Sequence, residues 1–140
     1  MKQDYPDTSY LCNLATKCGN FIVANFNLGL GMTKERKSDA TPLTVTDTTI
    51  NAEVCACMRR DFPHIQVLGE EESSEIENTE YTVMCDPVDG TIPFSHGLPI
   101  STFCISVLHN QMPIVGVIYD PFLGRMWHAE HGGGSFLGTE

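Results

Sequence analysis

The chain has 140 residues, the length of one ordinary domain and enough to bury a hydrophobic core. Apolar residues make up 41% of it and charged residues 19%, which excludes a disordered or fibrous protein. The formal net charge is -10, from 18 acidic and 8 basic residues, which argues against binding to nucleic acid or to an anionic membrane. A phosphorylated ligand would therefore need a local positive charge, and bound metal ions are one source.

The six cysteines form no C-x-x-C pair, and four of them lie in apolar or mixed surroundings typical of a core. The chain opens MKQDYPDTSY, without the charged-then-apolar order of a signal peptide, and contains no apolar run of membrane-spanning length. We therefore expect a reduced, cytoplasmic protein, with disulfides as the alternative.

The predicted elements begin with two helices. Residues 8–27 carry apolar side chains at helical spacing, and the glycines of NLGLGM end that pattern. A polar link follows, in which Pro42 keeps TPLTV extended. A second helix is predicted from about residue 47 to residue 60, and one of its faces is apolar.

The pattern then changes to short apolar runs of strand length. These runs lie at residues 65–69, 81–86, 101–109, 114–120 and 125–130. The tight turns between them predict antiparallel hairpins. Because the helices precede the strands without β-α-β alternation, the predicted fold class is α+β, with two N-terminal helices packed on a largely antiparallel sheet in one domain over 1–140.

Three acidic stretches fall where predicted strands end or helices begin. Asp47 opens the second helix, Glu70 and Glu71 follow one strand, and Asp86 and Asp89 follow another. At strand ends, side chains that are distant in sequence can converge on one point. Because these candidate ligands are all hard oxygen donors, they favour Mg²⁺, or Mn²⁺, over zinc.

The segment CDPVDGT combines features of a metal site and a phosphate site. Pro87 stiffens the turn, so that the Val88 carbonyl could join Asp86 and Asp89 around an ion. Residues 90–91 would then start a short helix whose free N–H groups face an anion. Two ions in such a pocket could activate water and stabilise the leaving oxygen of a phosphate ester.

Each piece taken alone has a simpler explanation. Asp47 could be an ordinary acidic residue at a helix start, GEEESSEIENTE a solvated loop and CDPVDG a plain turn. The EF-hand order of ligands is absent, and nothing favours the aromatic sugar cleft of a glycosidase. We expect His96 and His109 to be hydrogen-bonded structural residues and Trp127 to serve packing.

Taken together, TPLTVTD, VLGEEES, CDPVDGTIPFSHGLP, VGVIYDP and GGGSFLG resemble the inositol monophosphatase family of Mg²⁺-dependent, lithium-sensitive phosphatases in order and in spacing. The likeness covers nearly the whole chain. It implies the N-terminal half of a layered α/β/α/β/α sandwich. It also implies hydrolysis of a small phosphate monoester, such as an inositol, sugar or nucleotide phosphate, by a metal-activated water.

The resemblance further implies roles for individual residues. The groups that would hold metal are Glu70, Asp86, the Val88 carbonyl and Asp89. Asp47 and Thr91 would form a hydrogen-bonded pair that orients the attacking water, with Glu70 assisting through the ion. The backbone of Gly90 and Thr91 would hold the substrate phosphate, in a substrate site that also includes Glu70, Val88 and Asp89.

Two departures from the family pattern limit what the resemblance implies. Family members commonly have asparagine where this chain has Pro93, and a side-chain hydrogen bond is lost there. They are also about twice as long, and their second half carries a W-D-x-A-x-G motif that completes the second metal site. We expect the metal-binding half of such an enzyme, with the C-terminal half absent. The alternative is a non-catalytic metal- or phosphate-binding module that works with a complementing C-terminal half or as a homodimer.

Overall fold

The computed structural model describes residues 4–29, 34–36 and 42–138. In these segments α1 (Thr8–Asn27) and α2 (Val45–Asp61) precede one broad sheet, and α3 (Thr91–Ser95) is a short helix between two of its strands. The sheet has seven strands, in the spatial order β4 (Ser73–Ser74), β3 (Gln66–Gly69), β5 (Tyr81–Asp89), β6 (Thr102–His109), β7 (Met112–Asp120), β8 (Arg125–Glu130) and β9 (Gly134–Leu137). A separate two-stranded sheet pairs β1 (Lys34–Arg36) with β2 (Pro42–Thr44).

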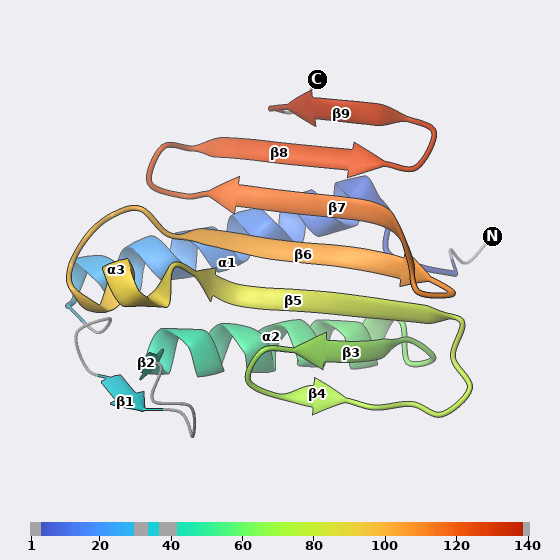
Figure 1. The fold of residues 1–140 in the computed structure, drawn as a ribbon, viewed down its shortest axis with the longest axis horizontal. Helices are drawn as coiled ribbons and strands as arrows, with labels where there is room; N and C mark the ends of the chain where they lie inside the picture. The colour runs from blue at the N-terminus through green and yellow to red at the C-terminus, as the bar shows by residue number, and fades with distance from the viewer. Residues whose placement is uncertain (1–3, 30–33, 37–41, 139–140) are drawn as a thin grey trace.

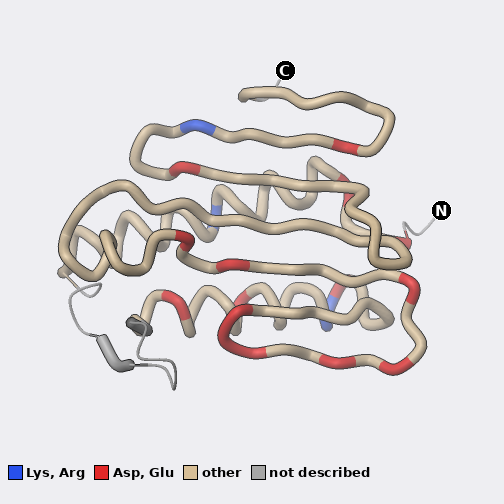
Figure 2. Tube along the Cα trace, viewed as in Figure 1, with Lys and Arg blue, Asp and Glu red and all other residues tan. Residues whose placement is uncertain are grey.

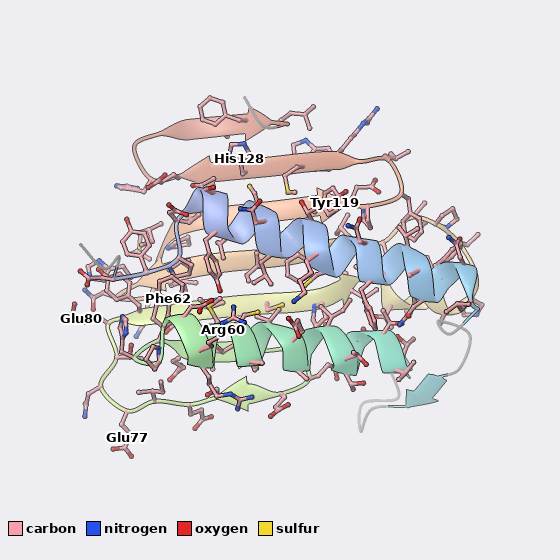
Figure 3. The ribbon with its side chains drawn as sticks, turned by 180° about the vertical axis from the view of Figure 1, so that it is seen from behind. Arg60, Phe62, Glu77, Glu80, Tyr119 and His128 are labelled. Atoms are coloured by element: carbon pink, nitrogen blue, oxygen red, sulfur yellow. The ribbon has the colours of Figure 1, made fainter. Side chains whose placement is uncertain are left out.

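The two long helices lie on the same face of the sheet. Figure 1 shows both of them behind the strands, and Figure 3, turned by 180°, shows them crossing in front. Neighbouring strands pair antiparallel, except that β3 and β5 run parallel. The predicted α+β class, with two N-terminal helices on a largely antiparallel sheet, is therefore confirmed.

The core lies between the sheet and these helices. Every second residue of the central strands faces the helices, and these residues are almost fully buried, among them Val83, Phe103, Ile105, Val107 and Val117. The apolar stripe predicted on α1 packs against them. Its last member, Phe26, is partly buried and contacts the rings of Phe94 and Phe122.

The local features differ from the sequence predictions in a few places. The second helix begins at Val45 rather than near residue 47, because the Thr44 side chain caps it. The strands β1, β4 and β9 and the parallel pairing of β3 with β5 were not predicted. The strand β4 consists of two serines, and β9 is a four-residue strand that begins with glycine, so neither sequence predicts a strand by itself. Each becomes a strand because it pairs with a neighbouring one.

The six cysteines are all free, and the four that are buried are Cys18, Cys55, Cys57 and Cys85. Their burial agrees with the prediction that four of the cysteines lie in core surroundings. No helix in the described part of the chain is long and apolar enough to cross a membrane.

We predict that Gly19→Ala destabilises the chain by about 1–3 kcal/mol, because the added methyl group overpacks the contact between α1 and β7. A Cβ at Gly19 would lie 2.9 Å from Cβ of Pro121 and closer still to the ring of Tyr119, which Figure 3 shows beside α1. Urea unfolding measures the change. The control is Asn20→Ala, at an exposed neighbouring position, where alanine's helix propensity should leave stability unchanged or raise it. Equal stability of both variants would contradict the prediction.

Candidate active site

The first component of the site is Asp47, in the first turn of α2. Its side chain is fully buried and closes a capping box with Thr44. The backbone N–H of Thr44 donates to Oδ2 of Asp47 at 3.0 Å, and the Thr44 hydroxyl donates to the same oxygen. Burial raises the pKa of Asp47, and the hydrogen bonds from Thr44 and Thr91 act in the opposite direction. The capping box therefore fixes the position of this carboxylate before any ligand is present.

The second component is the end of β5. Asp86 and Asp89 were predicted to follow a strand, and this was wrong: β5 continues through both of them. The register with β6 shifts between the two aspartates, since Asp86 lies opposite Cys104 and Asp89 opposite Thr102. Residues three apart in a regular strand point to opposite faces, but the extra residue of this bulge lets both carboxylates face the same side.

The third component is Glu70, the first residue after β3. Its backbone N–H donates to the Cys85 carbonyl at 3.1 Å, which holds it beside β5. The pKa of Asp86 is raised to about 7, first by burial and then by the nearby carboxylates of Glu70, Asp89 and Asp47. The parallel pairing of β3 with β5 thus brings Glu70 to the two aspartates.

Thr91, the first residue of α3, connects these components. Its hydroxyl lies 3.1 Å from Oδ1 of Asp47 and 2.9 Å from the Val88 carbonyl, and its single proton is donated to one of them at a time. Gly90 before it has a φ of 93°, a left-handed conformation that suits glycine. The Ser101 hydroxyl donates to the Gly90 carbonyl at 2.9 Å and fixes this turn.

Cys104 is a neighbour of the site that the sequence reasoning missed. Its thiol lies 3.8 Å from Oδ2 of Asp89 and donates to it. The only signal was its place within an apolar run, which gives no register, so its position opposite Asp86 became evident only from the pairing of β5 with β6.

The predicted site residues thus come from four segments and meet at one end of β5. The remaining predictions lie outside this cluster. His96 Nδ1 is 2.8 Å from the Ile92 carbonyl, and His109 stacks on the ring of Tyr81. Both are structural contacts, as expected. The acidic loop residues Glu72, Glu75, Glu77 and Glu80 are exposed, also as expected.

A hard divalent cation fits this donor set in two respects. Oδ1 of Asp86 is buried without a hydrogen-bond partner, and the charges of described residues that act most strongly on this carboxylate, those of Glu70, Asp89 and Asp47, are negative. The side chains alone do not complete a site, because no group of three or more His, Cys, Asp or Glu among the described residues is arranged to hold a metal. The Val88 carbonyl, which has a second lone pair beyond its contact with Thr91, is a further oxygen donor beside them.

The sequence matches the inositol monophosphatase family over residues 5–140. It is 36% identical over 106 residues to a histidinol-phosphatase of Mycobacterium tuberculosis, which covers 76% of this chain and 41% of that protein. It is 30% identical over 131 residues to an inositol monophosphatase of Dictyostelium discoideum, covering 91% and 48%. The solved structure of the Thermotoga maritima IMPase has a TM-score of 0.85 at 27% identity, covering 94% of this chain and 51% of that one. The chain therefore spans about half the length of the relatives it matches.

We predict that stability without divalent metal falls as the pH rises from about 4 to 7, because the folded state holds the Asp86 proton up to a pKa of about 7 and the unfolded state loses it near 3.8. Asp86→Asn removes this dependence. At pH 8 it should be more stable than the native chain by on the order of 1–2 kcal/mol, a figure reduced from about 1.4 kcal/mol per pKa unit because the carboxylate is partly exposed.

Thermal unfolding from pH 4 to 8 in the presence of a chelator measures this effect. The matched control is Glu77→Gln, which removes one negative charge from the loop between β4 and β5, where Figure 3 shows Glu77 projecting away from the fold. If the melting temperature of Asp86→Asn changes with pH in the same way as that of Glu77→Gln, the clustered carboxylates do not destabilise the folded chain.

Proposed function

The chain belongs to the inositol monophosphatase family, and we propose that it is the metal- and phosphate-binding half of a hydrolase that cleaves small phosphate monoesters. The observation that carries this proposal is the cluster of Glu70, Asp86 and Asp89 beside the hydrogen-bonded pair of Asp47 and Thr91. Burial and the negative charges of Glu70, Asp89 and Asp47 raise the pKa of Asp86, and a divalent cation would relieve that repulsion.

In this proposal Glu70, Asp86, the Val88 carbonyl and Asp89 hold Mg²⁺ or Mn²⁺. A bound cation supplies an activated water and offsets the negative charge of the phosphate, which a chain with a net charge of -10 must otherwise repel. Asp47, which Thr44 holds in place, accepts a hydrogen bond from Thr91 when the Val88 carbonyl is engaged with the cation, and so orients the Thr91 hydroxyl. This hydroxyl then positions the water that attacks phosphorus, and Glu70 assists.

The substrate phosphate binds at the start of α3 in this proposal. The first N–H groups of a helix have no partner within the helix, so the backbone of Gly90 and Thr91 can donate to phosphate oxygens. The left-handed turn at Gly90, held by Ser101, presents them beside Val88 and Asp89. Pro93 in the same turn contributes no amide side chain for a further bond.

The names of the relatives that this chain matches support a substrate class. Their names include an inositol monophosphatase, a histidinol-phosphatase and a fructose-1,6-bisphosphatase/inositol-1-monophosphatase. All are phosphatases of small metabolites, and we propose the same class for this chain. The free thiols support a reducing, cytoplasmic location.

A second candidate function is a metal- or phosphate-binding module without turnover of its own, which needs a partner chain. Two observations favour it. The described carboxylates do not form a closed metal site by themselves, and the chain spans half the length of its relatives. The two candidates differ in whether bound phosphate ester is hydrolysed.

We predict that Mg²⁺-dependent phosphate release is abolished by Asp89→Asn and lowered on the order of 100-fold by Thr91→Val, because the first removes a metal ligand and the second removes the hydroxyl that orients water. Thr91→Ser keeps that hydroxyl and should keep activity. Inositol, sugar and nucleotide phosphates are assayed with lithium as inhibitor, using the chain alone and the chain joined to the part of the Thermotoga maritima protein that it does not cover.

Binding of Mn²⁺, followed by its paramagnetic signal and compared with ester hydrolysis in the same samples, separates the two candidates. Asp89→Asn should weaken binding whichever candidate is correct, and Glu77→Gln should not. Metal binding without hydrolysis of any ester in either form of the protein favours the non-catalytic module. Hydrolysis that persists in Asp89→Asn rules out this site as the catalytic centre.

A further inference from the structure

The loop between β3 and β4 carries Glu70 on an exposed, acidic hairpin. It spans residues 69–72, because Leu68 pairs with Ser73 across it. Three of its four residues are glutamates, and Figure 2 shows this loop in red below the red segments of β5. Glu70 and Glu72 are both exposed. A hairpin loop with these properties opens easily unless a buried group holds it in place.

Asn51 of α2 holds this loop from inside the fold. Its side chain is 1% exposed, and its Nδ2 donates to the Glu72 carbonyl at 2.9 Å. The thiol of Cys55, one turn further along α2, lies 4.0 Å from the same carbonyl oxygen. The end of the loop is therefore tied to a buried face of α2, while the N–H of Glu70 ties its beginning to the Cys85 carbonyl of β5.

Gly69, the residue before Glu70, lets the loop backbone pack directly against Asn51. A Cβ at Gly69 would overlap both Oδ1 of Asn51 and the Glu72 carbonyl oxygen. Gly69 does not have a positive φ, so the lack of space, rather than the backbone conformation, requires glycine at this position. The Asn51 amide therefore contacts the loop on both sides of Glu70.

The Asn51 amide is also costly for the fold. Its Oδ1 is buried and has no hydrogen-bond partner in the described part of the chain. Leucine has the same branched shape and would leave no acceptor unsatisfied at this position. A buried polar atom without a partner needs an explanation, and such exceptions are typical of functional sites. The explanation here is the other end of the amide, which donates to the loop that carries Glu70.

We propose that Asn51 is a positioning residue, which fixes the loop between β3 and β4 so that the Glu70 carboxylate stays beside the aspartates of β5. Asn51 lies four residues after Asp47, so the two side chains share one face of α2. Asp47 bonds to Thr91, and Asn51 fixes the backbone that carries Glu70. One helix face thus aligns two segments that are distant in the sequence. This inference rests on the proposed function, because Glu70 belongs to the proposed metal site.

Amide hydrogen exchange of the metal-free chain, resolved by NMR, tests whether Asn51 fixes the loop. In Asn51→Leu we expect the Glu70 amide to exchange at least tenfold faster, because the loop is no longer held to α2 and the bond to Cys85 opens more often. The amide of Val83, in the middle of β5, reports opening of the sheet and should not exchange faster.

Gly69→Ala disturbs the same loop from the other side, since the added Cβ pushes Asn51 and Glu72 away, and it should accelerate the Glu70 amide as well. Ile22→Val is the matched control. It removes a methyl group from a fully buried side chain of α1, which lowers stability without changing the loop. Glu70 exchange as slow as in the native chain in both loop variants would overturn the proposal, as would an equal acceleration in Ile22→Val.

Mn²⁺ binding, followed by its paramagnetic signal, tests the consequence for the metal site. Asn51→Leu should weaken binding on the order of tenfold, although it leaves every proposed ligand in the chain, because residues that orient metal ligands have effects of this size. If the native chain binds Mn²⁺ and Asn51→Leu binds it equally well, the proposal is overturned. If the native chain binds none, the proposed metal site fails, and exchange of the Glu70 amide alone decides whether Asn51 positions the loop.

Discussion

The buried carboxylate of Asp47 joins the two parts of the chain that form the site. It caps α2 through Thr44 and accepts from Thr91 at the start of α3, so one side chain links the first turn of α2 to the segment that follows β5. A buried carboxylate without these bonds would be costly, and removing either threonine would leave it short of partners. The candidate site therefore rests on buried hydrogen bonds that the folded chain already makes.

The bulge in β5 is the second constraint, and it works against stability. By turning Asp86 and Asp89 to the same side, it brings like charges together near Glu70, and their repulsion adds to burial, the larger cause, in raising the pKa of Asp86. A regular strand would separate these carboxylates across the sheet. Repulsion that the folded chain tolerates without a cation is typical of functional sites, where local stability is exchanged for ligand affinity.

The sheet is also unequal in its two faces. The face toward α1 and α2 has a close-packed core, while the opposite face keeps large apolar side chains in water and a glycine in mid-strand that no neighbour in the described chain explains. The candidate site and this exposed face both depend on the pairing of β5 with β6, because Asp86 and Cys104 are partners across it.

The sequence by itself determined the helices, the main strands and the acidic segments of the site. Helical and strand periodicities are local, and they were correct for α1, β6 and β8 to within a residue. The prediction that Gly90 and Thr91 start a short helix was also correct, since a glycine before a helix is a local signal. Only the tertiary structure decided the parallel pairing that carries Glu70 to β5, the bulge that aligns Asp86 with Asp89, and the position of Cys104. These depend on strand register, which is set by contacts between residues far apart in the chain and so leaves little trace in any one segment.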